Sequence, residues 1–355
     1  MKYRTIEIPS SSPRTKASVL IIYAGGTIGM IRDGSDSLIP VNFNQILQQL
    51  PALDSLEVAI TVISFPNPVD SSEMDVQSWK EIAGLIFDHY DQYDGFIVLQ
   101  GTDTMAYTAS ALSYMLENLS KPVVLTGAQL PISAIRSDAR PNLISAIEIA
   151  VMKMNGISVV PEVCIYFDYR LLRGNRTSKI RSSRFNAFES ENYPTLAEVG
   201  IQIDFNIPAI IRREPGVGIR LNHKLDPNVV ILKIFPSITK QVVDAILETK
   251  GLKGVVLETY GSGNAPTYPW FIESLQAACK KGIIFYNVSQ CLGGKVIHGR
   301  YSTSKLLDEI GVISGRDITT EAAVTKLMFV LGNTGDLKTI KNHLSGPICG
   351  EMDAG

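Results

Sequence analysis

Residues 95–126, GFIVLQGTDTMAYTASALSYMLENLSKPVVLT, carry the pattern on which the fold assignment rests. Two short apolar runs, at 95–99 and 122–126, flank a longer segment with apolar residues spaced as in a helix. Because the two runs are continuously apolar rather than alternating, they are typical of strands buried on both faces of a parallel sheet covered by helices. The stretch therefore predicts a strand, a helix and a strand of an α/β fold.

The same alternation continues along the chain. Further apolar runs that end in glycine or polar residues lie at 18–26, 162–169, 229–235, 254–264 and 282–290. Amphipathic patterns separate them, at 75–90, 141–154, 238–250, 268–282 and 319–332. Between about 203 and 228 a segment with three prolines and mixed charge interrupts the pattern, which is typical of an interdomain connection. We expect a larger, mainly parallel-sheet domain at 1–205, a linker at 206–228 and a smaller α/β domain at 229–355.

Composition narrows the classes of function. The chain has 355 residues, a net charge of -2 and 45% hydrophobic residues, as in ordinary soluble proteins, and shows no sign of a nucleic-acid or membrane partner. No apolar stretch approaches the roughly 20 residues that span a bilayer. Residues 1–17 lack the apolar core of a secretory signal, so we expect a cytoplasmic protein.

Cysteine and histidine spacing indicates neither a metal site nor a cofactor. The four cysteines are widely spaced without a C-x-x-C pair, and the four histidines form no local pair at ligand spacing. We expect reduced thiols and no bound metal or cofactor. The histidine spacing also gives no sign of a histidine base, so we expect an enzyme with this sequence to use a different base.

Candidate site residues follow the strands, since ligands of open α/β sheets bind at the carboxyl ends of the strands. Gly25, Gly26 and Thr27 end the first run, in a stretch that matches neither a dinucleotide fingerprint nor a P-loop. Thr27 could cap a tight turn. Alternatively, the glycines let the backbone lie against a small ligand and Thr27 faces it.

Two further hydroxyl-rich stretches allow the same pair of interpretations. Thr102 and Asp103 could cap the following helix, or Asp103 could hold a substrate ammonium while Thr102 carries a proton. Asp70, Ser71 and Ser72 could start the helix at 75–90, or could form a clamp for the carboxylate of an amino acid.

The densest basic run is RLLRGNRTSKIRSSR, at 170–184. A solvated basic loop is its default interpretation, and a weak nucleic-acid patch is the next. A lysine of this run, placed near Thr102 and Asp103, could instead serve as a general base.

Together these segments resemble the bacterial L-asparaginases of the cytoplasmic type I class. The similarity extends from YAGGTIGM through DGFIVLQGTDTMAYTASALSYMLENL, KPVVLTGAQLP, RSDARPNL, YRLLRGNRTSK and YGSGNAP to TTEAAVTKL. The resemblance implies a two-domain α/β fold, a dimer of intimate dimers, and hydrolysis of asparagine to aspartate and ammonia without metal or cofactor. Glutamine is a possible second substrate.

The resemblance also implies roles for individual residues. Thr27 would be the nucleophile, and Thr102, Lys179 and Asp103 would form a second catalytic group in which Lys179 accepts a proton through Thr102. Substrate contacts would come from Asp70, Ser71, Ser72, Ala128 and, in a neighbouring subunit, Asn264. A threonine nucleophile needs an adjacent base, and lysine fills that role where no histidine does.

Three positions depart from the family pattern. Leu38 stands where the loop after the nucleophile usually carries a tyrosine, and Gln100 stands where histidine commonly precedes G-T-D-T. Glu258 replaces a basic side chain that serves a second asparagine site in cooperative members. An acid there would repel an effector carboxylate, so we expect no activation by asparagine at that site.

Two other functions remain open at this stage. One is the asparaginase-like, ammonia-releasing subunit of a tRNA-dependent amidotransferase. The other is a catalytically weak homologue that binds an amino acid.

Overall fold

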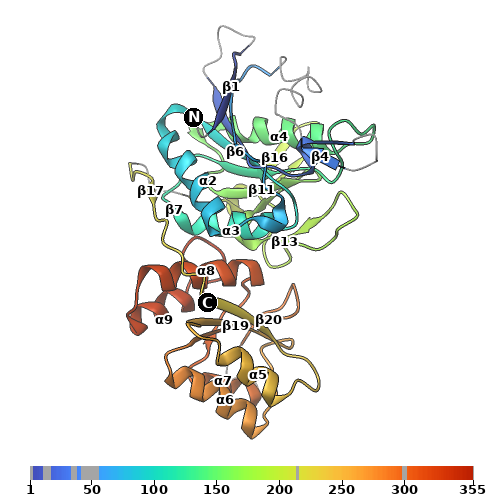
Figure 1. The fold of residues 1–355 in the computed structure, drawn as a ribbon. Helices are drawn as coiled ribbons and strands as arrows, with labels where there is room; N and C mark the ends of the chain where they lie inside the picture. Colours follow the sequence, from blue (N-terminus) through green and yellow to red (C-terminus); the bar gives the residue numbers. More distant parts are fainter. Residues whose placement is uncertain are drawn as a thin grey trace. The chain divides into compact units, whose positions relative to one another are not determined.

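The computed structural model describes residues 3–10, 17–32, 38–40, 56–212, 216–297 and 302–354. The chain divides into two compact units, Met1–His223 and Lys224–Gly355. Both combine a sheet with helices, and the predicted two-domain α/β fold is confirmed (Figure 1). Within the described residues, no helix has the length and apolar character to cross a membrane.

Unit 1 is built on a nine-stranded sheet with the order β1-β5-β2-β6-β8-β11-β12-β15-β16. The five strands from β5 to β11 are mutually parallel, and the strands at both edges run antiparallel to their neighbours. The strands are β1 (Arg4–Ile8), β2 (Ser18–Tyr23), β5 (Ala59–Ser64), β6 (Gly95–Leu99), β8 (Val123–Thr126), β11 (Val163–Phe167), β12 (Arg170–Arg173), β15 (Ala197–Val199) and β16 (Ile203–Phe205).

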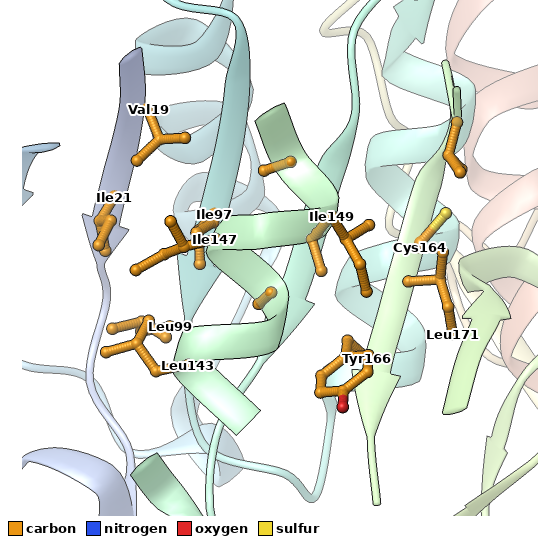
Figure 2. Packing of buried hydrophobic residues seen from close by; sticks show 14 of the residues in the cluster. Val19, Ile21, Ile97, Leu99, Leu143, Ile147, Ile149, Cys164, Tyr166 and Leu171 are labelled. Atoms are coloured by element: carbon orange, nitrogen blue, oxygen red, sulfur yellow. The ribbon is translucent and has the colours of Figure 1, made fainter. Parts of the chain in front are cut away.

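Helices cover both faces of this sheet because its central strands are apolar on both faces. Helix α4 (Ala139–Val151) lies on one face, and α2 (Val76–Asp88) and α3 (Met105–Met115) lie on the other (Figure 1). Figure 2 shows Leu143 and Ile147 of α4 directed at Ile21, Ile97 and Leu99 of the sheet. All five side chains are fully buried, so the helix is fixed over the strands whose ends carry the candidate site.

Shorter elements of unit 1 position the loops. The 3₁₀ turns are η1 (Thr27–Gly29), η3 (Ser71–Glu73), η4 (Tyr90–Gln92), η5 (Gly174–Arg176) and η6 (Ile207–Ala209). Short strands pair as β3 (Met30–Arg32) with β4 (Leu38–Pro40), β7 (Leu116–Glu117) with β17 (Arg220–Leu221), β9 (Lys153–Met154) with β10 (Ile157–Ser158), and β13 (Ser178–Lys179) with β14 (Phe188–Glu189).

Unit 2 contains a parallel four-stranded sheet in the order β18-β19-β20-β21. Its strands are β18 (Val229–Lys233), β19 (Gly254–Thr259), β20 (Ile284–Ser289) and β21 (Ile313–Ser314). Its helices are α5 (Lys240–Leu247), α6 (Pro269–Lys280), α7 (Ser302–Glu309), α8 (Thr320–Asn333) and α9 (Leu337–Ser345). Near its end the chain buries an ion pair, in which Lys326 Nζ lies 2.7 Å from Glu351 Oε1 and both side chains are fully buried.

Candidate active site

The site lies where four neighbouring parallel strands, β5, β2, β6 and β8, end at their carboxyl edge. Backbone hydrogen bonds connect the loops that leave these strands. The N–H of Ala24 donates to Leu99 O at 2.9 Å, and the N–H of Val69 donates to Ala24 O at 2.7 Å. The N–H of Gln100 donates to Thr126 O at 3.3 Å. The three hydroxyl-rich stretches predicted from the sequence are therefore adjacent in space.

The glycine pair allows the loops around the site to pack closely. A Cβ on Gly25 would lie 2.3 Å from Val69 O, and one on Gly26 would lie 2.3 Å from Gly101 N. Both glycines also have positive φ, 143° and 93°, which side chains rarely adopt. Glycine at these two positions therefore lets the loops after β2, β5 and β6 pack against one another, and the expected approach of a small ligand to this backbone stays a prediction.

Thr27 begins the 3₁₀ turn η1, and its side chain is half-buried. The hydroxyl of Tyr23, the last residue of β2, donates a hydrogen bond to Gly29 O at 3.4 Å and so stabilises this turn. Burial raises the pKa of Tyr23 to about 12, so the phenol stays a donor at neutral pH. Leu38 begins β4, which pairs with β3, and its side chain lies outside the described residues.

Lys179 contacts Thr102 and Asp103, which lie in the loop after β6. Its Nζ lies 2.7 Å from Thr102 Oγ1 and 2.6 Å from Asp103 Oδ1. The side chains of Lys179 and Asp103 are 14% and 67% exposed, and Thr102 is buried. Neither polar side chain caps α3, whose N-cap is Thr104, so the capping interpretation of this stretch is wrong.

The stretch after β5 combines a cap with a contact to the site. Asp70 is the N-cap of η3 and accepts hydrogen bonds from Ser72 N and Ser72 Oγ, which hold the pKa of Asp70 below its usual value. Ser71 is buried, and its hydroxyl donates to Asp103 Oδ2 at 3.4 Å. Thr104 Oγ1 donates to Ser71 O at 2.6 Å and so ties the β5 and β6 loops together.

The basic run at 170–184 is largely internal. Arg173 forms a buried ion pair with Glu162 at 2.6 Å, and Arg170 pairs with Glu189 at 2.7 Å. Arg176 is 2% exposed and lies 5.0 Å over the ring of Tyr193. The default interpretation of a solvated basic loop is wrong for these arginines, and their charges are not free for nucleic acid. This packing fixes the chain that leads into Lys179.

Two residues of the RSDARPNL stretch, for which the sequence predicted no role, hold the turn after β8. Asp138 accepts the backbone N–H groups of Gln129 and Leu130, and Asn142 donates to Gly127 O. Ala128 lies within this turn with its side chain buried in the core, and its predicted contact with a substrate stays a prediction. The signal that could have identified Asp138 is an acid just before a helix that follows a strand-end turn.

Gln100 and Glu258, the other two positions that depart from the family pattern, both form hydrogen bonds within the protein. Gln100 is buried and donates to Gly101 O at 3.3 Å. In unit 2, Glu258 accepts a hydrogen bond from Thr320 at 2.6 Å and pairs with Lys233 at 3.2 Å. Asn264 forms a backbone bridge with Tyr260 just after β19. The predicted roles of Asn264 and Glu258 stay predictions.

Two cavities of unit 1 differ in their relation to this edge. One, of about 700 Å³, borders the turn after β8 and the loop after Lys179, and its lining includes Gln129, Leu130 and Ser182. The other, of about 960 Å³, includes Asp94 and Lys121, which precede β6 and β8, and so lies at the opposite edge of the sheet. We assign function to the carboxyl edge because the hydroxyl, amine and carboxylate groups meet there. The part of the chain with described placement holds no group of three or more metal-ligating side chains.

Comparison with known proteins agrees with this geometry. The family models described as "Asparaginase, N-terminal" and "Glutaminase/Asparaginase C-terminal domain" match residues 18–210 and 228–344. L-asparaginase 1 of Escherichia coli K12 is 41% identical over 342 residues, which cover 95% of this chain and 98% of that protein. The crystal structure of L-asparaginase I from Vibrio cholerae matches with a TM-score of 0.86 and 36% identity, covering 96% of this chain and 100% of that one. A glutamyl-tRNA(Gln) amidotransferase subunit of Pyrococcus abyssi is 33% identical over 340 residues, which cover 94% of this chain and 76% of that protein.

Proposed function

This chain belongs to the asparaginase family, and we therefore propose that it is an amidohydrolase that converts L-asparagine to L-aspartate and ammonia. The observation that carries the proposal is the position of Lys179 Nζ, 2.7 Å from Thr102 Oγ1 and 2.6 Å from Asp103 Oδ1, at the sheet edge where β2 delivers Thr27. An amine in hydrogen-bond contact with a hydroxyl is the arrangement that proton transfer needs when histidine is absent.

In the proposed reaction, Thr27 Oγ attacks the side-chain amide carbon of asparagine. The Thr27 proton is transferred to the leaving nitrogen. The C–N bond then breaks, ammonia leaves, and an ester between Thr27 and the substrate remains. Water, activated by Thr102 with Lys179 as base, then attacks the ester and releases aspartate and the Thr27 hydroxyl. Backbone N–H groups near Thr27 and Thr102 stabilise the oxyanion, each contributing about 3 to 4 kcal/mol when preorganised.

Substrate recognition follows from the charges at the same edge. Asp103, the most exposed member of the group, holds the α-ammonium, and Ser71 with the backbone of Ser72 holds the α-carboxylate. Asp70 acts on this pocket by fixing Ser72 rather than by direct contact, since its carboxylate accepts from both Ser72 N and Ser72 Oγ. The backbone at Ala128 meets the amide to be cleaved.

The proposal also covers the oligomeric state of the protein and its cellular compartment. We expect a homo-oligomer, a dimer of dimers, in which Asn264 of one subunit completes the site of another, and we expect no metal or cofactor. A cytoplasmic location agrees with Cys164, Cys279 and Cys291, none of which is in a disulfide. Light scattering of the purified protein measures the assembly.

Higher identity and fuller coverage favour asparaginase over an amidotransferase component. The identity is 41% to E. coli L-asparaginase 1, with 98% of that protein covered, against 33% and 76% for the amidotransferase relative from P. abyssi. A weak amino-acid-binding homologue would bind asparagine without turnover, which activity measurements separate from an enzyme.

Ammonia release from asparagine and from glutamine, measured over a concentration series, tests the function. We expect release by the wild type, with asparagine preferred, and loss of nearly all release in Thr27→Val with an unchanged fold by circular dichroism. The matched control is Thr249→Val, which changes an exposed threonine of unit 2 and should retain full activity. Asparagine binding by calorimetry without ammonia release from the wild type would indicate the binding homologue instead, and full turnover by Thr27→Val would exclude Thr27 as the nucleophile.

A further inference from the structure

Asp138 lies just before α4 and binds the turn after β8 through three backbone contacts. Its two carboxylate oxygens lie 3.1 and 2.9 Å from Gln129 N, and Oδ1 lies 3.0 Å from Leu130 N. The side chain is buried, with the residue 8% exposed. Hydrogen bonds to a buried carboxylate are charge-assisted and roughly twice as strong as neutral ones. A single side chain thus fixes two consecutive peptide groups of the turn.

A second side chain from the same helix binds the other end of the turn. Asn142 Nδ2 donates to Gly127 O at 3.0 Å and to Asp138 Oδ2 at 3.3 Å. Asn142 is also buried, at 3% exposure. Donors and acceptors of the 127–130 turn are therefore both bound to the start of α4, a helix that the sheet core holds rigidly.

Packing alone does not fix this turn. The cavity of about 700 Å³ borders Gln129 and Leu130, so part of the turn faces open space rather than packed side chains. On its other side, Gln129 Nε2 donates to Arg184 O at 2.9 Å, in the loop between Lys179 and β14. The turn that presents the backbone of Ala128 is thus linked to the hairpin that carries Lys179, and the hydrogen bonds from Asp138 and Asn142 set its place.

We propose that Asp138 is a positioning residue that sets the selectivity of the enzyme for the side-chain length of its amide substrate. This inference rests on the proposed function, because it requires the 127–130 turn to meet the amide that is cleaved. Glutamine has one methylene more than asparagine, which moves its amide carbon by about 1.5 Å. A misplacement of about 1 Å can cost about a hundredfold in rate, so only a turn fixed more closely than this separates the two amides strongly.

The test is the ratio of kcat/KM for asparagine to kcat/KM for glutamine in Asp138→Asn. This variant keeps the volume but replaces one carboxylate oxygen with a donor that faces backbone N–H groups. We expect kcat/KM for asparagine to fall about tenfold or more, with a smaller fall for glutamine, so that the ratio drops about fivefold, within the range that one methylene controls. Partial unfolding cannot produce this result, because it lowers both activities equally.

Asp94→Asn is the matched control. Asp94 also accepts a backbone N–H, from Ser18 at 2.8 Å, but lies at the opposite edge of the same sheet, so the ratio should not change. If Asp138→Asn fails to fold, Asn142→Leu, which removes the bonds to Gly127 O and to Asp138 Oδ2, is measured in the same way and should lower the ratio.

The outcomes are distinct. An active wild type with an unchanged ratio in Asp138→Asn, or in Asn142→Leu where that variant replaces it, overturns the positioning role and leaves the proposed function intact. A wild type that releases ammonia from neither amide overturns the proposed function and the selectivity inference together.

Discussion

Lys179→Met tests the central group of the site, because it removes the amine while keeping most of the side-chain volume. The ion pair that is lost joins Lys179 to Asp103, whose side chain is 67% exposed. Because the Asp103 end of the pair is open to solvent, the pair contributes about 0.2 to 1 kcal/mol to folding, and the free energy of unfolding should fall by about 1 kcal/mol or less. The loss of a general base lowers kcat by about 10² to 10⁴-fold, a rise in the activation free energy of about 3 to 5 kcal/mol.

The assay combines steady-state ammonia release with thermal unfolding of the same preparation. Lys153→Met is the matched control, since Lys153 forms an ion pair of equal length, 2.6 Å, with Asp94 at the opposite edge of the sheet. The control should retain wild-type kcat. If folded Lys179→Met retains more than a tenth of the wild-type kcat, Lys179 is not the base. If both variants lose activity equally, the effect is one of charge or folding rather than of the site.

Two further predictions concern the backbone and the buried charges. Gly26→Ala should destabilise unit 1 by about 2 kcal/mol or more and abolish turnover, because φ is 93° and the new Cβ would meet Gly101 N at 2.3 Å. Gly84→Ala, in α2 with nothing within 4 Å of the added Cβ, should instead be neutral or stabilising by about 0.5 to 1 kcal/mol in thermal melts; equal losses in both variants would contradict this reasoning. In unit 2, Glu351→Gln leaves the Lys326 charge buried without its partner and should cost about 3 to 5 kcal/mol in urea unfolding at pH 7. Burial raises the pKa of Glu351, but Lys326 and backbone N–H groups outweigh it and hold that pKa below the usual 4.5, so the wild type should lose this stability as pH falls from about 4.5 through the folded pKa. A wild type and a Glu351→Gln variant whose stabilities fall in parallel below pH 5 would show that this carboxylate does not govern the acid transition.

For both Asp70 and Asp103, the local sequence allowed two interpretations, a helix cap or a site residue. An acid before a helix fits a cap; Asp70 caps the 3₁₀ turn η3, whereas Asp75 caps the expected helix, α2. Asp103 fits the same rule, yet it binds Lys179, 76 positions further along the chain. The local sequence does not distinguish a capping acid from Asp103, because Lys179, the partner of Asp103, lies far away in the sequence.

Strands and helices with strong patterns were predictable, and those without were missed. The parallel strands β2, β6, β8, β11, β18, β19 and β20 all lie within the predicted apolar runs. Those runs do not include β5, although its loop carries Ser71, nor the edge strand β1 that pairs with it. Segments β1 and β5 are strands because they pair with neighbouring strands in the sheet, and not because of a distinctive sequence pattern.

Periodicity, turn residues and motif order are properties of short stretches, so they are enough to predict an α/β chain with two domains, hydroxyls at the strand ends and a resemblance to a family. The order of the strands is not local. Folding places β5, β2, β6 and β8 side by side, turns Gly25 and Gly26 toward other loops, buries Arg173 and Arg176, and brings Lys179 to Thr102 across 77 positions. The physical reason is that a site is a set of distances between residues far apart in the chain, and those distances come from the packing of the sheet and its helices.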